Sequence, residues 1–255
     1  MYAEHRPAPD LAGHLRCGWM SVTTGPVAVL PDGCLDLMWL GGELVVAGPD
    51  TTAMPSDLPA GTEVAAVRFR PGAAPAVLGL PAAELRDRRV PLAELWPDAA
   101  RLADQVAGAA GPAARVAVLQ DTVRGRLPDA PPVDPLARAV AATLARGPAH
   151  RSPADGTGPA GVVAALAARA GLSERQLHRR CVAAFGYGAK TLDRVLRLQR
   201  FLAVDRADPG RGLAALAAAA GYADQAHLSR ECRALAATTP ARLVRSVQDR
   251  AAGDA

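Results

Sequence analysis

Two short stretches of this sequence place basic and amide side chains at helical spacing. Arg175, His178 and Arg179 are three and four positions apart, so on a helix they share one face. Arginine can donate two parallel hydrogen bonds to guanine, and histidine or glutamine can contact several bases in the major groove. A second set of this kind follows later in the chain and comprises Gln225, Ala226, His227 and Arg230. We therefore predict that both sets read DNA bases.

Other side chains in the same region are suited to binding the DNA backbone. Hydroxyl and cationic groups contact phosphate oxygens, and such contacts add affinity without reading sequence. We predict phosphate contacts for four residues: Ser173, Lys190, Arg194 and Arg233. Arg197 is expected instead to pair with a carboxylate inside the fold.

Each base-reading set must be held by a helix that follows a tight turn. In the first unit, residues 162–185, an apolar helix ends at Gly171 and Ser173 can cap the next helix. The second unit, residues 213–236, repeats this order around Gly221. Residues spaced at helical intervals predict the buried faces of the two reading helices: Leu177, Cys181 and Phe185 in one, Leu228, Cys232 and Leu235 in the other. Both cysteines are therefore expected to be inert packing residues.

A long helical stretch from Lys190 to Leu202 joins the two units. A helix rises ~1.5 Å per residue, so this stretch can separate two reading helices rigidly. If the separation is about one turn of DNA, ~34 Å, both helices can enter successive major grooves on one side of the duplex.

Residues 133–250 resemble the DNA-binding domain of the AraC/XylS family of bacterial transcription regulators. The resemblance is carried by Leu166-Ala167, by Gly171 to Arg179, by Leu213 to Glu231 and by Thr239-Pro240. It implies an all-α double helix-turn-helix domain that binds double-stranded DNA in a sequence-specific way. It also implies transcription regulation, with activation among the expected roles, although the residues leave activation and repression open. RNA polymerase is open as a further partner.

The first part of the chain carries the pattern of short strands and tight turns. Extended segments are predicted at 26–30, 34–40, 43–47 and 63–70, separated by Pro-Asp-Gly, Gly-Gly and Pro-Gly turns. This pattern favours a small antiparallel sandwich or barrel. Short helical pieces are predicted at 75–80, 81–88 and 91–96, and a longer helical segment from 99 to 127 is interrupted at Gly111-Pro112.

The same part is similar to a sensor domain found in a subset of AraC/XylS regulators. The similarity lies in Leu30 to Leu37, Ala47-Gly48-Pro49 and Val67 to Gly72. It implies a cupin-like, mainly β fold over residues 1–105, but it implies no ligand. Residues 106–132 are then a helical linker, which either supplies a homodimer contact or covers its own sheet.

Three polar residues of this part are candidates for an effector pocket: Cys34, Asp36 and Arg68. Strand alternation places Cys34, Asp36 and Met38 on one face and Leu35, Leu37 and Trp39 on the other. Such a pocket would suit a small polar or electrophilic effector. The alternative, which we favour, is that Asp36 pairs with an arginine for structural reasons. No metal site is predicted, because His5 and His14 lack the spacing of metal ligands.

Charge is distributed unevenly along the chain. Residues 161–250 hold 15 basic and 7 acidic residues, a balance of +8, whereas the remainder holds 14 basic and 18 acidic, a balance of −4. Only the C-terminal part is therefore expected to meet a polyanion. Without a signal peptide or an apolar run of ~20 residues, the chain is expected to be cytoplasmic, with no membrane contact and no structural disulfides.

A non-enzymatic regulator without a cofactor is the leading hypothesis. The alternative is a cupin-like enzyme, or an acceptor of alkyl groups and electrophiles that uses Cys34 and is targeted to DNA. The sequence shows neither clustered metal ligands nor an acid/base pair that would support this alternative.

Overall fold

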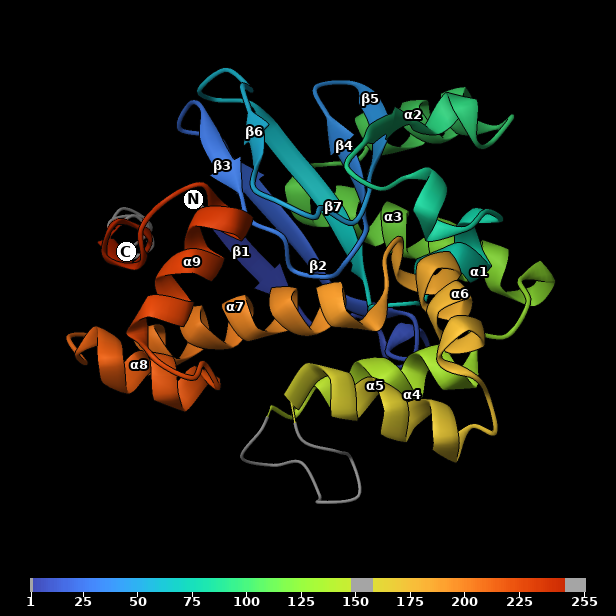
Figure 1. Cartoon of the computed structure of the whole chain (residues 1–255). Coiled ribbons are helices and arrows are strands. Elements are labelled where there is room, and N and C mark those ends of the chain that lie inside the picture. Colours follow the sequence, from blue (N-terminus) through green and yellow to red (C-terminus); the bar gives the residue numbers. More distant parts are fainter. Residues whose placement is uncertain (1, 148–157, 246–255) are drawn as a thin grey trace.

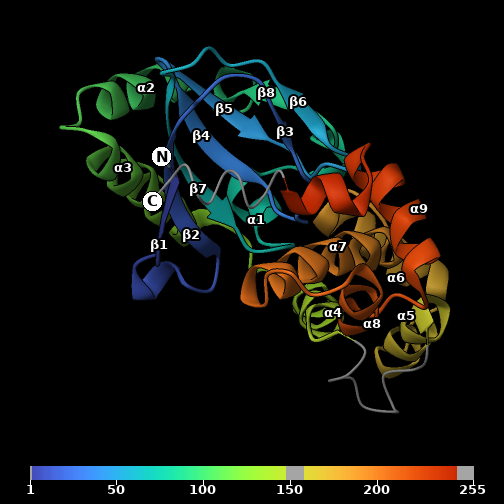
Figure 2. The same ribbon diagram turned by 90° about the vertical axis from the view of Figure 1, so that its left-hand side faces the viewer.

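A computed structural model describes residues 2–147 and 158–245 of the chain. The N-terminal part is mainly β and the C-terminal part is helical, as predicted (Figures 1 and 2). In Figure 1 the sheets lie above the long helix α7 (Ala189–Ala207), and the other C-terminal helices gather at the two ends of α7.

The N-terminal part contains two antiparallel sheets. The larger has the strand order β1-β2-β7-β4-β5-β8, so its edges are β1 and β8. Its strands are β1 (Tyr2–His5), β2 (Leu15–Val22), β4 (Asp36–Leu40), β5 (Glu43–Ala47), β7 (Glu63–Phe69) and β8 (Arg89–Pro91). The smaller sheet pairs β3 (Val27–Val29) with β6 (Met54–Ser56). The expected β fold is thus present as an open sheet and a separate ribbon.

Strand β4 shows the predicted alternation of its side chains. Leu37 and Trp39 belong to the main hydrophobic core, which also contains Leu35. Asp36 lies on the opposite face, where it is the cross-strand partner of Arg68 on β7. Burial of the apolar face fixes the register, because a slip by one residue would turn every core side chain outward.

Helices α2 (Ala99–Ala107) and α3 (Pro112–Arg126) cover one face of the large sheet. The close approach of α3 to β2 requires a glycine, since a Cβ placed on Gly18 would lie 2.3 Å from Val116 Cγ1. Leu119 and Val123 of α3 join the same core as the strands. The segment therefore covers its own sheet, and a dimer contact through it stays a prediction.

Two predicted helical pieces are shorter than expected. Helix α1 (Ala74–Leu78) is present, but 81–88 forms only a 3-10 turn at Ala82–Glu84, and 91–96 only one at Leu92–Glu94. Asp87 adopts a left-handed backbone with φ of 57°, which ends any helix there. Further 3-10 turns lie at Pro9–Leu11 and Leu127–Asp129.

The C-terminal part builds two small cores that share α7. It also contains α4 (Pro135–Ala145), α5 (Gly158–Arg169), α6 (Glu174–Phe185), α8 (Leu213–Ala220) and α9 (Gln225–Ala236). Leu192 of α7 packs with α4, α5 and α6, whereas Phe201 packs with α8 and α9. At ~1.5 Å per residue, the 19 residues of α7 extend about 28 Å.

Candidate nucleic-acid interface

The first helix-turn-helix unit joins α5 to α6 through a left-handed glycine. Gly171 has a φ of 63°, a conformation that side-chain-bearing residues rarely adopt. Ser173 then caps α6: its Oγ accepts from the Gln176 amide at 3.3 Å, while Gln176 Oε1 accepts from the Ser173 amide at 2.9 Å. This reciprocal pair fixes where the reading helix begins.

Helix α6 presents two distinct faces. Leu177, Cys181 and Phe185 are at most 1% exposed and form the predicted buried face. Arg175, His178 and Arg179 are exposed on the other side. The imidazole of His178 also lies against Gly188 in the turn before α7, because a Cβ placed there would be 2.7 Å from Nδ1. The unit thus offers two exposed arginines and one histidine that is partly held by its own fold.

The second unit repeats the design with a different cap. Gly221, with a φ of 88°, ends α8, and the Asp224 carboxylate accepts from the His227 amide at 2.6 Å to start α9. Leu228, Cys232 and Leu235 are buried as predicted. Four residues of the opposite face are exposed: Gln225, Ala226, Arg230 and Arg233.

His227 is less free than its neighbours on α9. Its Nδ1 accepts from the Ala223 amide at 3.4 Å, and its ring meets the Tyr222 ring edge-on with centroids 5.3 Å apart. The ring therefore helps to close the turn before α9. A base contact by His227 stays a prediction and would have to use the other ring nitrogen.

Ion pairs orient both reading helices. Arg180 on α6 bonds to Asp134, the N-cap of α4, at 2.9 and 2.5 Å. Arg194 on α7 bonds to Glu231 on α9 at 3.2 and 2.8 Å. Burial raises the pKa of Asp134, but hydrogen bonds from Arg180 and the Leu136 amide outweigh it, so the pKa lies below its ordinary value.

These pairs bear on the predicted phosphate contacts. Arg194 is occupied by Glu231, and Ser173 by its capping bonds, so each would have to share or leave its partner to bind phosphate. Lys190 and Arg233 are exposed, and within residues 2–147 and 158–245 no carboxylate pairs with either. As expected, Arg197 pairs with a carboxylate, that of Asp193.

The pairing partners Asp134 and Glu231 are positioning residues that the sequence did not identify. Each lies far along the chain from its arginine, and an acidic residue near a helix end is by itself an ordinary solvated group. Their roles emerge only when α4 packs beside α6 and α9 beside α7.

The candidate effector residues of the N-terminal part form a closed polar cluster. Both oxygens of Asp36 accept from Arg68, at 3.0 and 2.9 Å, and Oδ2 also accepts from Trp19 Nε1 at 3.0 Å. Arg68 further lies 3.3 Å from Asp32. Asp36 thus pairs with an arginine, as the favoured interpretation predicted, and an effector role for this cluster stays a prediction.

Cys34 sits at the edge of this cluster. It is 5% exposed, and its amide donates to Asp32 Oδ1 at 2.9 Å. Burial, followed by the nearby charge of Asp32, raises the pKa of its thiol well above the ordinary value. A thiol in this state is a poor nucleophile, because the thiolate is the reactive form.

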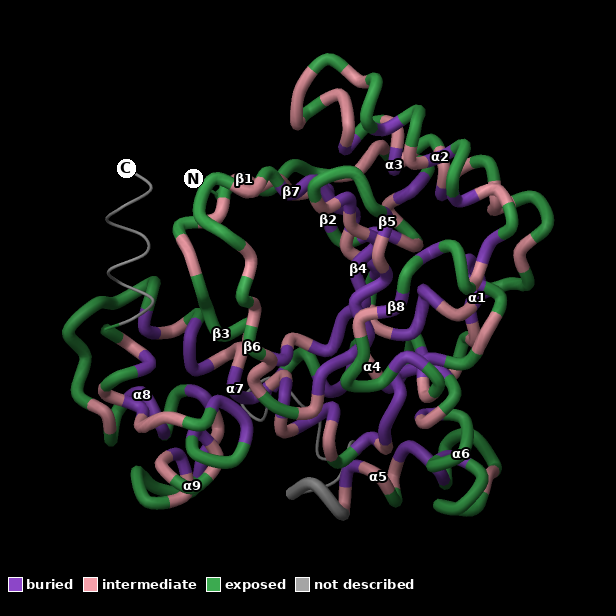
Figure 3. Tube along the Cα trace, turned by 90° about the horizontal axis from the view of Figure 1, so that it is seen from above, coloured by how far each residue is buried: buried purple, intermediate pink, exposed green. Residues whose placement is uncertain are grey.

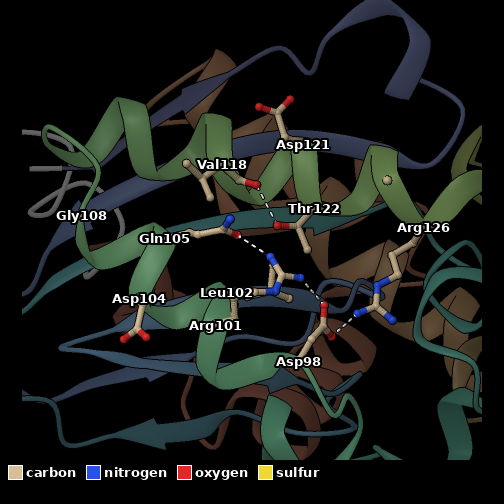
Figure 4. Close-up of a pocket in the computed structure, with 11 residues that line it drawn as sticks. Asp98, Arg101, Leu102, Asp104, Gln105, Gly108, Val118, Asp121, Thr122 and Arg126 are labelled. Carbon is tan, nitrogen blue, oxygen red and sulfur yellow. Dashed lines mark hydrogen bonds and ion pairs between the residues drawn. The ribbon is translucent and has the colours of Figure 1, made fainter.

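A polar groove of about 630 Å³ opens between α2 and α3 (Figure 4). Asp98 accepts there from Arg101 at 2.7 Å and from Arg126 at 2.5 Å, and the Arg126 guanidinium stacks 3.8 Å from the centroid of the Trp96 ring. Asp98, Arg101 and Arg126 are therefore paired with one another inside the groove. Its residues lie apart from the predicted effector residues.

In residues 2–147 and 158–245, no three His, Cys, Asp or Glu side chains gather in a way that could hold a metal ion. Over the same residues, no helix has the length and apolar character needed to cross a membrane.

Comparison with known proteins matches two segments of the chain to family models. Residues 3–91 match a family described as a domain of unknown function (DUF6597), and residues 166–246 match one described as a helix-turn-helix domain. No curated protein matches the chain. Two solved structures of ToxT from Vibrio cholerae are similar in outline. For an apo variant the TM-score is 0.48 and the sequence identity 11%. The match covers 89% of this chain and 96% of the ToxT chain. For the second structure the TM-score is 0.48 and the sequence identity 8%. The match covers 88% of this chain and 97% of the ToxT chain.

Proposed function

We propose that this chain is a DNA-binding transcription regulator of the AraC type, whose C-terminal helix-turn-helix domain inserts α6 and α9 into successive major grooves. The observation that carries this proposal is the arrangement of two separately capped helices at opposite ends of α7, each with an exposed basic face (Figure 1). An α7 of about 28 Å is compatible with a spacing of one DNA turn, ~34 Å.

In this proposal the exposed residues have separate roles. Arg175 and Arg179 on α6, and Gln225 and Arg230 on α9, read base edges, and the exposed Ala226 contacts a thymine methyl group. His178 and His227 assist where their contacts within the fold permit. Lys190 and Arg233 bind phosphate, which makes affinity fall steeply with salt.

Control by the N-terminal part completes the proposal. This part contacts the helices that carry the reading faces, so an effector or a second copy of the chain that alters its loops can alter DNA binding. RNA polymerase is a further proposed partner, and the DNA target implies a cytoplasmic location. We assign no catalytic step to the chain, since Cys34, the nucleophile of the enzymatic alternative, is buried as a thiol of raised pKa.

The test is selection of binding sites by the full chain from a random DNA library. We expect an enriched sequence with two short motifs about one helical turn apart, protected on one side of the duplex in a footprint. Arg179→Ala and Arg230→Ala should each cost ~1–3 kcal/mol of specific binding and relax base preference in one motif.

Arg6→Ala is the matched control, because Arg6 is an exposed arginine of the N-terminal part. It removes the same charge and should leave both motifs intact. Failure of the wild-type chain to enrich any sequence would overturn the proposal. Unchanged base preference in the Arg179 and Arg230 variants would remove those residues from the reading role.

A further inference from the structure

One loop of the N-terminal part touches the C-terminal ends of both reading helices. This loop, residues 48–53, connects β5 to β6. At one end, Pro49 lies against Gly186, the residue that terminates α6, since a Cβ placed on Gly186 would be 2.6 Å from Pro49 Cγ. At the other end, the Ala53 amide donates to the Leu235 carbonyl in the last turn of α9 at 2.7 Å.

These contacts supply hydrogen-bond donors to carbonyl groups at the helix ends. The last four carbonyls of an α-helix have no partner within the helix. The N-terminal part supplies donors at both ends: Ala53 N–H to the Leu235 carbonyl, and Arg86 Nη1 to the Gly186 carbonyl at 3.2 Å. A cation at the C-terminal end of α6 also suits the helix dipole. The β domain therefore takes part in capping both reading helices.

The loop between these two contacts is firmly anchored. Asp50 is 7% exposed and accepts from Arg89 at 2.8 and 2.7 Å. Thr51 donates from its amide to Asp87 at 2.6 Å. Gly48 packs so closely that a Cβ there would lie 1.6 Å from the Leu85 carbonyl oxygen. Through these contacts, segment 85–89, which includes Arg86, fixes the position of the loop.

The reach of the loop limits the distance between the helix ends. Four residue steps separate Pro49 from Ala53, and an extended chain spans at most ~3.6 Å per residue, so their Cα atoms lie within about 14 Å. Because Pro49 meets the end of α6 and Ala53 the end of α9, the two ends cannot separate without breaking one of these contacts.

We propose that loop 48–53 is a spacer that sets the relative position of α6 and α9, and with it the distance between the two DNA motifs that the chain accepts. This inference rests on the proposed function and gives the N-terminal part a specific means of control. A change in the β domain that moves the loop moves both reading helices at once.

The first test measures the spacing of the helices without DNA. Spin labels are attached at Ala183→Cys on α6 and Ala234→Cys on α9, both exposed positions, while the four native cysteines are buried. Two glycines are inserted between Thr52 and Ala53, which keeps the anchors of Asp50 and Thr51 but loosens the contact with Leu235. We expect one narrow distance distribution in the wild-type background and a broader or shifted one after insertion.

The matched control inserts two glycines between Gly41 and Gly42. This exposed hairpin turn joins β4 to β5 and has no neighbouring atom within 4 Å of either glycine's Cβ position. The control should keep the wild-type distances. Ala53→Pro is a second variant, in case the insertion prevents folding: it removes the N–H donor to Leu235 without lengthening the loop. Melting curves identify the variants that remain folded.

The second test selects DNA from a library in which the gap between the two motifs varies. Wild-type and control chains should prefer one gap, whereas the loop variants should accept several and bind the wild-type gap about tenfold more weakly, comparable to one mismatched base pair. Unchanged helix distances and unchanged gap preference in folded loop variants would overturn the spacer. If no chain selects any DNA, the proposed function fails instead, and the distance measurement still decides the spacer.

Discussion

Arg194 on α7 donates from Nε to both carboxylate oxygens of Glu231 on α9, at 3.2 and 2.8 Å. The pair bridges the connecting helix and the second reading helix. It also neutralises an arginine that the sequence assigns to a DNA phosphate. We predict two roles for this side chain: pairing with Glu231 in the fold, and binding a DNA phosphate once Glu231 no longer holds it.

Glu231→Gln separates these two roles. The substitution frees Arg194, so we expect the slope of log K against log salt to steepen by about 0.9, the value for one added phosphate contact. The loss of stability should be only ~0–1 kcal/mol, because Arg194 is partly exposed. Binding isotherms over a range of salt concentrations measure the slope. Glu94→Gln, at an exposed site of the N-terminal part, is the control, and an unchanged slope for Glu231→Gln would mean that Arg194 makes no phosphate contact.

Asp134 both caps α4 and pairs with Arg180, and two substitutions distinguish these roles. Asparagine can still cap, so Asp134→Asn should cost only the ion pair, ~0.2–1 kcal/mol, whereas Asp134→Ala should cost ~1–2 kcal/mol in all. Urea unfolding at pH 7 measures both. Equal losses in the two variants would show that the cap contributes nothing.

The Asp134 pair should also depend on pH. Its pKa is lower in the folded chain than the unfolded value of ~3.9, so its stabilisation is present above about pH 4. The stabilisation is lost as the pH falls through the folded pKa. The difference in unfolding free energy between wild type and Asp134→Asn should therefore close in acid. A difference that persists at low pH would contradict the ion-pair explanation.

The reading helices could be predicted from sequence because local signals coincide there. A glycine that ends one helix, a Ser or Asp that caps the next, and apolar residues at helical spacing all point to the same fold around Gly171 and Gly221. Strands β4 and β5 were equally predictable, since Gly41-Gly42 marks their turn and side chains alternate along β4.

Other elements carry no such local signal. Strand β2 is buried on both faces near Cys17 and Gly18, so its sequence lacks alternation. Strands β6 and β8 contain Pro55 and Pro91, a residue that argues against a strand in sequence. They form because each pairs with a neighbouring strand. The spacer contact between Ala53 and Leu235 joins two backbone groups, which no side-chain pattern can reveal. The strand predicted at 26–30 is present as β3, but it is exposed along its length, so its valines mark no buried face (Figure 3).

The cysteines should resist modification in the folded chain. All four are at most 5% exposed, and burial, the leading cause, raises the pKa of Cys17 and Cys181 to about 11 and that of Cys232 to about 12. Thiolate is therefore scarce at pH 7. Mass spectrometry after brief treatment with iodoacetamide should find no rapid modification in native protein and four modified cysteines in denaturant. Rapid modification of native Cys34 would support the alternative hypothesis that this residue accepts electrophiles.

Tyr187, in the turn between α6 and α7, carries a buried hydroxyl that has no hydrogen-bond partner among the described residues. Burial raises the pKa of this tyrosine, and the charges of Asp32 and Asp50 of the β domain add to the rise. A buried polar group without a partner costs ~1–3 kcal/mol, so Tyr187→Phe should leave the free energy of unfolding unchanged or increase it.

Denaturant unfolding at neutral pH measures the effect of Tyr187→Phe, and the DNA affinity should stay at the wild-type value because the ring keeps its packing. Tyr2→Phe is the control: Tyr2 is 43% exposed and donates to Glu4 at 2.6 Å, so it should lose ~0–1 kcal/mol. A loss of more than about 1 kcal/mol in Tyr187→Phe would mean that the hydroxyl holds a partner at the domain junction, such as an ordered water. That partner would then lie beside Gly33, since a Cβ placed on Gly33 would be 3.8 Å from the Tyr187 hydroxyl oxygen.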